Sequence, residues 1–490
     1  AGGRDRFRQC GEGEETWKLS SHDGTESDLH YYLQGGCERV KRHIPRILLT
    51  APASGSGKTL ITCGILQALV NRGMKVASYK CGPDYIDPMF HGRVIGTRSR
   101  NLDTFFTDTE TTRYLFAENA SDCDIAVTEG VMGYYDGLGG VRTEGSTYDV
   151  AAALAIPAVL IVSCRGASLS ILAMIKGFLE YRPDSRIKAV ILNQISPMIY
   201  GQLKPLIEVE LGVKVLGYVP KLTDLNLESR HLGLVLPGEI ESLKEKLNRL
   251  AAVLDETLDL DAFCTLAEDT EELTIQVPEI PVLEAPKKIR LAVAADDAFC
   301  FTYQDNLKLL ETMGAELVFF SPLQDKKLPE EVDGMILSGG YPELHAKTLS
   351  ENHSMREAIR KAIEDGMPCI AECGGFLYLH RELEGQDGVF YPMAGVLDAK
   401  AYRTDRLGRF GYITLTAEED QLLGKAGMEI RGHEFHYWDS TENGEDCMAV
   451  KPDGKRSWSC IHAEPGLFAG YPHLYYPSNR AWIENFLKCR

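Results

Sequence analysis

The segment Ala51-Pro-Ala-Ser-Gly-Ser-Gly-Lys-Thr59 decides the fold of the first half of the chain. It follows the apolar run Ile47-Leu48-Leu49 and precedes a helical pattern of apolar residues between Ile61 and Leu69. A glycine-rich loop at this place lets backbone N–H groups surround phosphate oxygens at the start of a helix. The order of strand, loop and helix therefore predicts a phosphate-binding loop, although Pro52 occupies the position of the usual first glycine.

The polar residues of this loop have separate expected roles in binding ATP and Mg²⁺. Lys58 supplies positive charge to the phosphates, and the Thr59 hydroxyl can bind Mg²⁺ at the helix N-terminus. A plain glycine–serine turn is the alternative, but it does not explain why a strand precedes the loop and a helix follows it. The residues expected to bind the nucleotide are Ser54, Gly55, Ser56, Gly57, Lys58 and Thr59.

The pattern of a short apolar run followed by a longer spacer recurs through the first half of the chain. Each spacer is long enough for the crossover helix that parallel strands need. We therefore expect an α/β fold with a doubly wound parallel sheet. Its further strands are expected at Val76–Tyr79, Ile125–Thr128, Ala158–Val162, Ala189–Leu192 and Val215–Tyr218.

Acidic residues follow two of these strands. Glu129 directly follows one of them, and Asp84 and Asp87 lie in the segment Lys80-Cys-Gly-Pro-Asp-Tyr-Ile-Asp-Pro88. Because the carboxyl ends of the strands line the ligand crevice of such a sheet, Glu129 and Asp84 are expected to help bind Mg²⁺. The alternative for these carboxylates, and for Asp136, is that they cap turns or helices.

Three arginines, Arg93, Arg98 and Arg100, lie close together just before Asn101-Leu-Asp103 in an otherwise acidic protein. A substrate with several carboxylates needs such a basic group of side chains. We expect these arginines to bind the substrate, and the alternative is that they are ordinary solvated surface residues.

The length of the chain, 490 residues, exceeds what one hydrophobic core usually organises. The range 267–288 has a glutamate-rich start and three prolines, which is typical of an extended linker. We therefore expect a polar appendage at 1–44, a first domain at 45–266 and a second at 289–490. The second domain is expected to be α/β, with strands at Ile289–Ala294, Leu317–Phe320, Met335–Leu337 and Cys369–Ala371 and helices at 304–313 and 351–365.

The second domain contains the segment Pro368-Cys-Ile-Ala-Glu-Cys-Gly-Gly-Phe376, in which an apolar strand leads into Cys373 and a helical pattern follows. This arrangement resembles a nucleophile elbow, whose sharp turn exposes the reactive side chain. A thiol at a helix N-terminus is expected to have a lowered pKa and to react as the thiolate. Gly374 and Gly340 are expected to donate backbone N–H groups to a tetrahedral oxyanion.

A thiol nucleophile needs a base, and histidine is the usual one. His473, just before the last predicted helix, is our first candidate. His433 and His436 compete with it, but no cysteine completes a metal site with them, so a core or pocket role is preferred for both.

The composition excludes several classes of protein. The formal net charge of −19 opposes binding to nucleic acid, and no apolar run is long enough to cross a membrane. The thirteen cysteines show no metal-ligand pairs, and the polar N-terminal stretch lacks the apolar segment of a signal peptide. We therefore expect a cytoplasmic enzyme with reduced thiols.

A phosphate-binding loop in one domain and a Cys-Gly-Gly elbow in the next form a specific combination. From about Arg46 to its C-terminus the sequence resembles the cobyrinic acid a,c-diamide synthase family. The resemblance implies a P-loop NTPase-like domain similar to dethiobiotin synthetase, followed by a class I glutamine amidotransferase-like domain. The segments that carry it are Ala51–Thr59, Lys80–Pro88, Glu129–Gly137, Glu372-Cys-Gly-Gly375 and Gly432-His-Glu-Phe-His436.

The resemblance implies that ATP activates the a and c side-chain carboxylates of a corrinoid and that ammonia from glutamine amidates them. Cys373 and His473 would form a dyad, because Tyr475 stands where class I domains usually carry the glutamate that orients the histidine. Asp84, Asp87 and Asp136 would lie near the substrate, and a homodimer is common among the relatives.

Two alternatives stay open at this point. The same chemistry could act on another tetrapyrrole, such as nickel-sirohydrochlorin or hydrogenobyrinic acid. More distantly, a P-loop nucleotide switch could carry a non-catalytic partner domain, although Cys373 and His473 argue against this.

Overall fold

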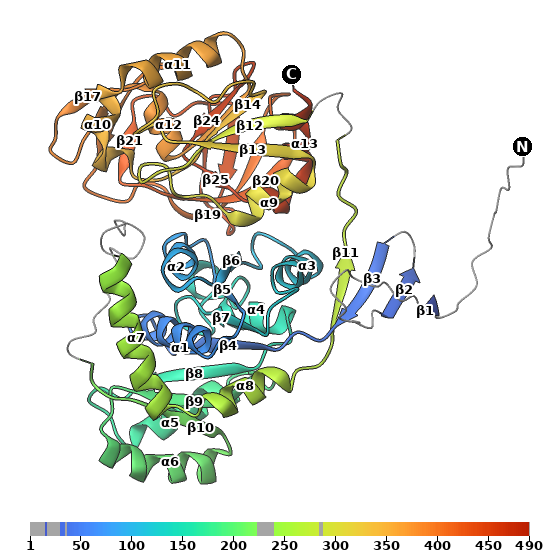
Figure 1. The fold of residues 1–490 in the computed structure, drawn as a ribbon, viewed down its shortest axis with the longest axis vertical. Helices are drawn as coiled ribbons and strands as arrows, with labels where there is room; N and C mark the ends of the chain where they lie inside the picture. The colour runs from blue at the N-terminus through green and yellow to red at the C-terminus, as the bar shows by residue number, and fades with distance from the viewer. Residues whose placement is uncertain (1–14, 17–29, 35–36, 223–239, 284–287, 490) are drawn as a thin grey trace, which may run out of the picture.

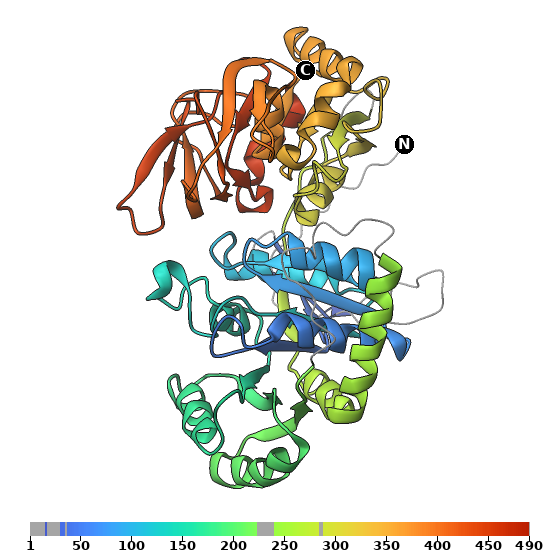
Figure 2. The ribbon, with the colours of Figure 1, turned by 90° about the vertical axis from the view of Figure 1, so that its left-hand side faces the viewer.

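The computed structural model describes residues 15–16, 30–34, 37–222, 240–283 and 288–489. Two α/β domains follow each other along the longest axis of the molecule, as Figures 1 and 2 show. The first domain, in blue to green, carries the predicted phosphate loop, and the second, in yellow to red, carries Cys373. The predicted α/β fold class with parallel sheets is confirmed.

The first domain is built on a seven-stranded parallel sheet with the order β10-β9-β8-β4-β7-β5-β6. One strand, β6, was not predicted, because its sequence Arg-Ser-Arg-Asn-Leu is polar and lacks an apolar run. The strands are β4 (Arg46–Thr50), β5 (Val76–Cys81), β6 (Arg98–Leu102), β7 (Ile125–Glu129), β8 (Ala158–Ser163), β9 (Ile187–Asn193) and β10 (Lys214–Val219).

Both faces of this sheet are buried, which is why its strands are apolar without alternation. In β4, Leu48 packs into one core and its neighbours Ile47 and Leu49 pack into the other, since successive side chains point to opposite faces. The helical segments that accompany the sheet are α1 (Lys58–Asn71), α2 (Ile86–Phe90), the π-helix η1 (His91–Ile95), α3 (Thr109–Asn119), η2 (Leu138–Gly140), α4 (Thr147–Ala153), α5 (Ser170–Glu180), α6 (Pro197–Leu211), α7 (Ile240–Thr257) and α8 (Leu260–Glu268).

The register of three adjacent strands positions the candidate site. Glu129, the last residue of β7, lies opposite Leu49 of β4 on one side and opposite Lys80 of β5 on the other. Because these strands are parallel, their carboxyl ends meet at one edge of the sheet. The phosphate loop that leaves β4 therefore begins beside Glu129 and Lys80.

The second domain also contains a parallel sheet, with the order β13-β12-β14-β15-β24. Its strands are β12 (Ile289–Ala294), β13 (Ala315–Phe320), β14 (Gly334–Leu337), β15 (Cys369–Glu372) and β24 (Leu467–Gly470). The helical segments of this domain are α9 (Gln304–Thr312), η4 (Pro342–Leu344), α10 (Ala346–Glu351), α11 (His353–Glu364), α12 (Gly374–Leu379), η5 (Tyr476–Ser478) and α13 (Arg480–Lys488).

Two smaller sheets, whose strands pair mostly antiparallel, lie between α12 and α13 in the chain and add to the predicted parallel architecture. They were not predicted, because their strands are short and several are half exposed, which weakens the apolar signal. One has the order β17-β16-β18-β21 and the other the order β23-β22-β19-β20-β25. The strands are β16 (His380–Glu384), β17 (Phe390–Pro392), β18 (Leu397–Arg403), β19 (Phe410–Ala417), β20 (Glu429–Phe435), β21 (Trp438–Ser440), β22 (Cys447–Val450), β23 (Ser457–Cys460) and β25 (His473–Leu474).

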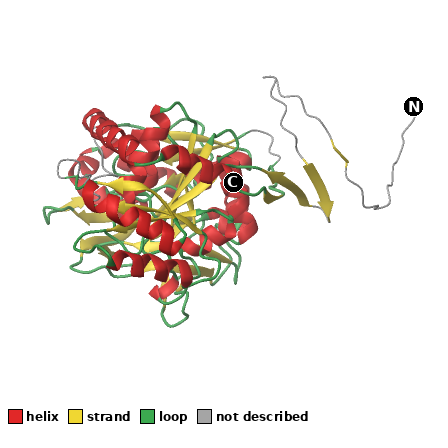
Figure 3. Cartoon of the chain, turned by 90° about the horizontal axis from the view of Figure 1, so that it is seen from below, coloured by secondary structure: helices red, strands yellow, loops and turns green. Residues whose placement is uncertain are grey.

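A separate antiparallel sheet joins the ranges that were predicted as an appendage and as a linker. It has the order β1-β2-β3-β11, and Figure 3 shows it projecting from the side of the molecule. Most of residues 1–36 lie outside the described residues. None of the described helices is both long and apolar enough to cross a membrane. The strands are β1 (Glu15–Thr16), β2 (His30–Gln34), β3 (Cys37–Arg42) and β11 (Leu273–Val277).

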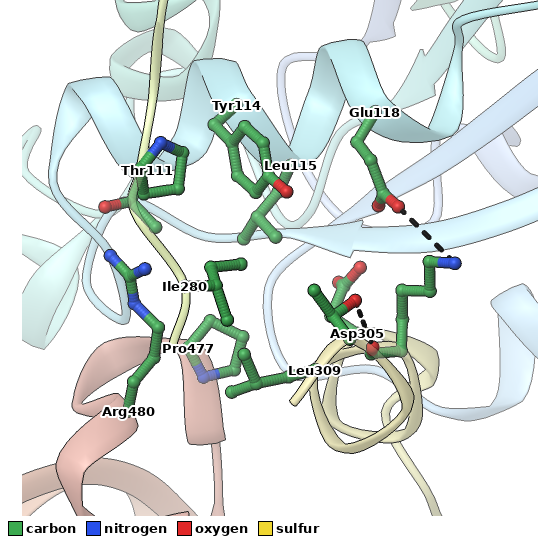
Figure 4. A pocket seen from close by; sticks show the side chains of 12 residues that line it. Thr111, Tyr114, Leu115, Glu118, Ile280, Asp305, Leu309, Pro477 and Arg480 are labelled. Carbon is green, nitrogen blue, oxygen red and sulfur yellow. Dashed lines mark hydrogen bonds and ion pairs between the residues drawn. The ribbon is translucent and has the colours of Figure 1, made fainter. Parts of the chain in front are cut away.

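The two domains contact each other through polar pairs and aromatic side chains. Tyr412 Oη donates a hydrogen bond to Asp103 Oδ2 over 2.7 Å. In a second part of the contact, Lys308 of α9 lies 4.0 Å from Glu118 of α3. Figure 4 shows this region from close by, with Glu118 and Asp305 labelled. A core cluster also draws on both domains, since it joins Tyr85 and Phe106 with Tyr303, Tyr475 and Leu115.

Candidate active site

The phosphate loop turns sharply into α1 at Gly57, which has a φ of +91°. A Cβ atom at Gly57 would lie only 2.4 Å from Asn193 Nδ2, so the position requires glycine both for its conformation and for space. Asn193 itself donates a hydrogen bond from Nδ2 to the Ser56 carbonyl over 2.8 Å. The end of β9 therefore supports the loop, and the sequence analysis did not identify Asn193.

Behind this loop lies a chain of buried charged groups. Lys58 Nζ donates to the Met132 carbonyl over 2.5 Å, and Thr59 Oγ1 donates to Glu129 Oε1 over 2.6 Å. Lys80 Nζ lies 2.7 Å from the same Glu129 oxygen and 2.5 Å from Asp87 Oδ2. The structure thus brings together Lys58, Thr59, Asp87 and Glu129 of the predicted site and adds Lys80, to which no role was given.

The charges of this network compensate one another. Burial alone would lower the pKa of Lys80, but the carboxylates of Glu129 and Asp87 raise it well above 10.5. Burial would raise the pKa of Asp87, but Lys80 outweighs this and lowers it. Burial lowers the pKa of His91, which lies 3.7 Å from Glu129 Oε2, to about 4, so this ring is neutral at pH 7. Lys80 is therefore a structural counter-charge at the base of the site.

The donors next to the loop fit a magnesium ion. Thr59 Oγ1 and Glu129 Oε1 are hard oxygen atoms 2.6 Å apart, and Glu129 Oε2 is buried without a hydrogen-bond partner among the described residues. Mg²⁺ is usually held by one or two protein oxygens together with substrate phosphates and waters. No group of three or more His, Cys, Asp or Glu side chains in the described ranges is arranged to hold a metal.

Asp84 and Asp136, also predicted near the ligands, lie in turns. Asp84 Oδ1 accepts a hydrogen bond from the Ile86 amide over 2.8 Å, and Asp136 Oδ2 accepts one from the Gly133 amide over 3.0 Å. Burial and the charge of Asp87 raise the pKa of Asp84 to about 6. Both carboxylates therefore brace loops at the carboxyl edge of the sheet, and Asp84 also lines the cavity described below.

The three arginines predicted to bind substrate are separated in the structure. Arg98 is exposed and lies 3.6 Å from Asp122, whereas Arg100 Nε lies 3.2 Å from Asp305 of the second domain. Arg93 lies earlier in the chain, in η1. None of the three is among the residues that line the cavity between the domains.

Cys373 occupies the sharp turn between β15 and α12, with a φ of +47° that is unusual for a residue other than glycine. Close packing explains the glycines around it. A Cβ atom at Gly375 would lie 2.1 Å from the Leu337 carbonyl, and one at Gly374 would lie 2.8 Å from the Gly340 amide nitrogen. The predicted oxyanion donors Gly340 and Gly374 are therefore neighbours beside the thiol.

The expectation of a lowered thiol pKa was wrong for this structure. Burial raises the pKa of Cys373, and the nearby carboxylate of Glu343 raises it further, while the Gly374 amide lowers it by less. The helix that starts at this turn, α12, is only six residues long. Desolvation of the thiolate therefore outweighs the favourable amide groups, and Cys373 is a neutral thiol at pH 7.

His473 lies on β25 and is buried against the loop that follows β14, since a Cβ atom at Gly339 would lie 2.3 Å from His473 Cε1. Burial and the charge of His436 lower the pKa of His473 to about 3, so the ring is neutral and can accept a proton. Its Nδ1 atom has no hydrogen-bond partner among the residues that the structure describes. Its ring stacks on His433, with 5.0 Å between centroids.

The position that usually carries the orienting acid has another contact here. Tyr475 Oη donates a hydrogen bond over 2.8 Å to Asp305 Oδ2, and Asp305 also pairs with Arg100 of the first domain. Tyr475 thus belongs to the contact between domains. The two competing histidines have partners of their own, since His433 Nδ1 lies 3.1 Å from Tyr303 Oη and His436 Nδ1 lies 2.6 Å from the Trp438 carbonyl.

One cavity of about 900 Å³ lies between the two predicted centres. Asp84, Met132 and the loop at 137–142 line it from the first domain, and Cys373 and His473 line it from the second. Because Met132 is bonded to Lys58, the cavity reaches the neighbourhood of the phosphate loop at one end and the thiol at the other.

Two further residues of this cavity were missed by the sequence analysis. Glu343 faces Cys373 from η4, and burial raises its pKa to about 7. Tyr85 comes from the first domain but stacks on Phe301, with 5.0 Å between centroids, and lies 5.4 Å from the His473 ring. Tyr85 stood inside a segment already singled out, Lys80–Pro88, but its contact partners are more than 200 residues away in the chain.

Comparisons with known proteins cover both domains. Residues 47–235 match the CobQ/CobB/MinD/ParA nucleotide binding domain, and residues 290–481 match the CobB/CobQ-like glutamine amidotransferase domain. A cobyrinate a,c-diamide synthase of Listeria innocua is 40% identical over 442 residues, which are 89% of this chain and 97% of that protein. One of Thermoplasma volcanium is 40% identical over 455 residues, 91% of this chain and 97% of the relative.

Proposed function

The chain belongs to the cobyrinate a,c-diamide synthase family, and we propose that it uses ATP and glutamine to amidate the a and c side-chain carboxylates of cobyrinic acid. It is accordingly a glutamine-hydrolysing, ATP-dependent carbon–nitrogen ligase of cobalamin biosynthesis. A nucleotide switch with a non-catalytic second domain is set aside.

The glutamine half of the reaction takes place at the thiol. His473, which is neutral, accepts the proton of Cys373 as the sulfur attacks the side-chain carbonyl of glutamine. The amides of Gly340 and Gly374 stabilise the oxyanion that forms, and the amide nitrogen takes the proton back from His473 and leaves as ammonia. Water then hydrolyses the glutamyl thioester and regenerates Cys373. Because both Cys373 and His473 begin neutral, charge separation at this site occurs only during the attack.

The ligase half takes place at the phosphate loop. A carboxylate of the corrinoid attacks the γ-phosphorus of ATP, ADP leaves, and an acyl phosphate forms. Ammonia then attacks the acyl carbon and displaces phosphate, which leaves the amide. Lys58 supplies positive charge to the phosphates, and its amine is within reach because, among the described residues, its one hydrogen bond is to the Met132 carbonyl.

Thr59 and Glu129 are the residues that would hold Mg²⁺, which supplies positive charge to the phosphate oxygens when it is bound. Burial raises the pKa of Glu129, and Lys80, which pairs with it at 2.7 Å, partly offsets this rise. Asp87, on the other side of Lys80, completes the charge balance.

The single observation that best supports the proposal is the cavity shared by the two domains. Its walls include Cys373 and His473 as well as Asp84 and the loop next to Lys58. Ammonia released at the thiol therefore enters the same space in which a carboxylate can approach the phosphate loop, without first passing into bulk water.

A substrate panel tests the proposal. Purified protein with ATP, Mg²⁺ and glutamine is offered cobyrinic acid, hydrogenobyrinic acid and nickel-sirohydrochlorin in separate reactions, and each product is analysed by mass spectrometry. We expect two successive amidations, with the highest kcat/KM for cobyrinic acid. A higher value for another ring would change the assigned substrate, and no amidation of any ring would contradict the proposal.

A further inference from the structure

The cavity between the domains has an aromatic wall, which we define as Phe410, Phe435 and Tyr437. These side chains are 57%, 46% and 45% exposed, although aromatic residues of this size are normally buried. Phe410 and Phe435 are directly paired across β19 and β20, with 5.6 Å between ring centroids, and Tyr437 follows at 5.8 Å from Phe435. Contiguous exposed apolar surface of this kind often marks a binding site.

The opposite side of the cavity is also apolar at its surface. Val141, in the loop after η2, is 89% exposed, and Met132 is 42% exposed. Both residues line the cavity from the first domain, facing the domain that carries the aromatic wall. A ligand that fills the cavity would therefore contact apolar side chains of both domains.

Positive charge collects at this cavity in a protein whose formal net charge is −19. Arg142 of the first domain and Lys451, Lys455 and Arg456 of the β22–β23 turn line it. Lys451 is already bonded to backbone carbonyls of β19, and Lys455 lies 3.9 Å from Asp453. Within the described ranges, no hydrogen bond or ion pair is recorded for the guanidinium group of Arg142 or Arg456.

The size of the cavity also limits the ligand. About 900 Å³ lies at the upper end of the range of roughly 300–1,000 Å³ found for small-molecule sites. Glutamine, which needs only the region around Cys373, does not account for it. Three acidic side chains also line the cavity, and each has a contact already described. Asp84 accepts a hydrogen bond from the Ile86 amide, Asp453 lies near Lys455, and Glu343 faces Cys373.

We propose that this cavity seats the flat ring of the tetrapyrrole, with the aromatic wall against one face and with Arg142 and Arg456 paired to carboxylate side chains that are not being amidated. The inference rests on the proposed function and adds the binding site of the ring to it. A planar apolar ring packs well on aromatic side chains, and a guanidinium group binds a carboxylate through two parallel hydrogen bonds. Arg142 and Arg456 thus take the place that Arg93, Arg98 and Arg100 had in the sequence analysis.

The pairing of cations from both domains has a mechanistic consequence. Arg142 belongs to the domain that binds ATP, whereas Arg456 and the aromatic wall belong to the domain that releases ammonia. A ring held by both would sit across the domain contact, and its reactive carboxylate would lie toward Asp84 and the phosphate loop.

Three variants test this inference in the full chain: Phe435→Ala, Arg456→Ala and the double variant Arg142→Ala/Arg456→Ala. Binding of the tetrapyrrole is measured by titration of its visible absorbance, and its KM is measured with ammonia as nitrogen donor. We expect KM and Kd to rise about tenfold for each single variant, since a hydrogen bond to a charged group, or a stacked aromatic contact, is worth about 1–3 kcal/mol, where 1.4 kcal/mol is tenfold. In the double variant, KM and Kd for the tetrapyrrole should rise further.

Matched controls separate binding from general damage. Phe390→Ala removes a side chain that is 43% exposed on β17, and Arg381→Ala removes an exposed arginine of β16, both outside the cavity lining. We expect neither control to change the KM for the tetrapyrrole. The thermal unfolding temperature of every variant is measured to show that it is folded.

The two levels of the account fail in different ways. If the wild type amidates the tetrapyrrole but the cavity variants bind it as tightly as Phe390→Ala and Arg381→Ala do, the ring is seated elsewhere and the proposed function stands. If the wild type neither binds nor amidates any tetrapyrrole, the proposed function fails and this inference fails with it.

Discussion

The phosphate site and the thiol site begin at the same kind of structural position and differ in their charge. Each follows the carboxyl end of a parallel strand, β4 in one domain and β15 in the other, and each precedes a helix. At the phosphate site, Lys80 lies between the carboxylates of Glu129 and Asp87, so buried charges are paired in advance. At the thiol site, burial keeps both Cys373 and His473 neutral.

The difference follows from the task of each site. In the proposed reaction ATP and Mg²⁺ arrive charged, so a site with fixed opposing charges is organised for them before they bind. Glutamine presents an uncharged amide to the thiol, and charge appears there only as the bond forms. The comparison therefore predicts that charge-removing substitutions damage the phosphate site, whereas the thiol site depends on one nucleophile.

The largest expected effect is that of Cys373→Ser. A hydroxyl group in this buried site is a far weaker nucleophile than a thiol, so glutamine-dependent amidation should fall by at least about 10³-fold. Ammonia-dependent amidation should stay within about twofold of the wild type, because the phosphate site is intact. Both rates are measured by product mass spectrometry, and an equal loss of the two activities would show that the sites are not separable.

The next effect is that of Glu129→Gln, which leaves Lys80 with Asp87 as its remaining carboxylate. Removing one partner of a buried ion pair typically costs about 3–5 kcal/mol, so we expect a loss of about 3 kcal/mol in the free energy of unfolding. Amidation should be lost with glutamine and with ammonia alike. Urea denaturation and both assays check this.

Asp122→Asn is the matched control for that substitution. Its side chain is 70% exposed and pairs with the exposed Arg98, so both the stability and the activity should stay at the wild-type level. Ammonia-dependent activity that survives in Glu129→Gln would remove this residue from the phosphate site.

The pH behaviour of His473 gives a sharper test of the neutral thiol site. Its pKa is lowered to about 3, so the ring loses its proton far below pH 5 and stays neutral at every higher pH. Its ring resonances in histidine-labelled protein, assigned with His473→Asn, should not titrate between pH 5 and 8. An inflection near the ordinary histidine pKa of about 6.5 would show that the site is more hydrated than the structure implies.

The smallest expected effect is that of Tyr412→Phe, which removes the hydrogen bond to Asp103 across the domain contact. Asp103 keeps the Phe105 and Phe106 amides as donors, so the free energy of unfolding should fall by only about 1–2 kcal/mol. Tyr402→Phe, on β18, is the control and should be neutral. A loss as large as that in Glu129→Gln would mean that the domains depend on this one bond.

Local spacing explains which parts of the site could be predicted from the sequence. A pattern of about ten residues, made of a strand, a turn and the start of a helix, is enough to predict the phosphate loop and the Cys373 elbow. Glu129 is likewise predicted from its place at the end of a strand. Lys80, Asn193 and Tyr85 could not be assigned in this way, because their roles depend on which strands become neighbours. Glu129, for example, meets Lys80 only because β7 lies next to β5.

The same reasoning explains why the arginines predicted to bind substrate do not line the cavity between the domains. Arg93, Arg98 and Arg100 are dense in the sequence, but the fold sends Arg98 to Asp122 and Arg100 to Asp305. Arg142 and Arg456 lie more than 300 residues apart in the sequence, and they line one cavity because the two domains pack together. The antiparallel strands that carry Phe410 and Phe435 were likewise not predicted, because they are only partly buried and contain no continuous apolar run.

The most direct test of the account follows one nitrogen atom. The protein is incubated with cobyrinic acid, ATP, Mg²⁺ and glutamine labelled with ¹⁵N in its amide group, in buffer that contains unlabelled ammonium, and the product is analysed by mass spectrometry. We expect a diamide that carries ¹⁵N at both new amides, because ammonia passes from Cys373 through the shared cavity. A diamide that carries unlabelled nitrogen from the buffer ammonium would contradict the shared cavity, and an unchanged cobyrinic acid would contradict the assignment of the enzyme itself.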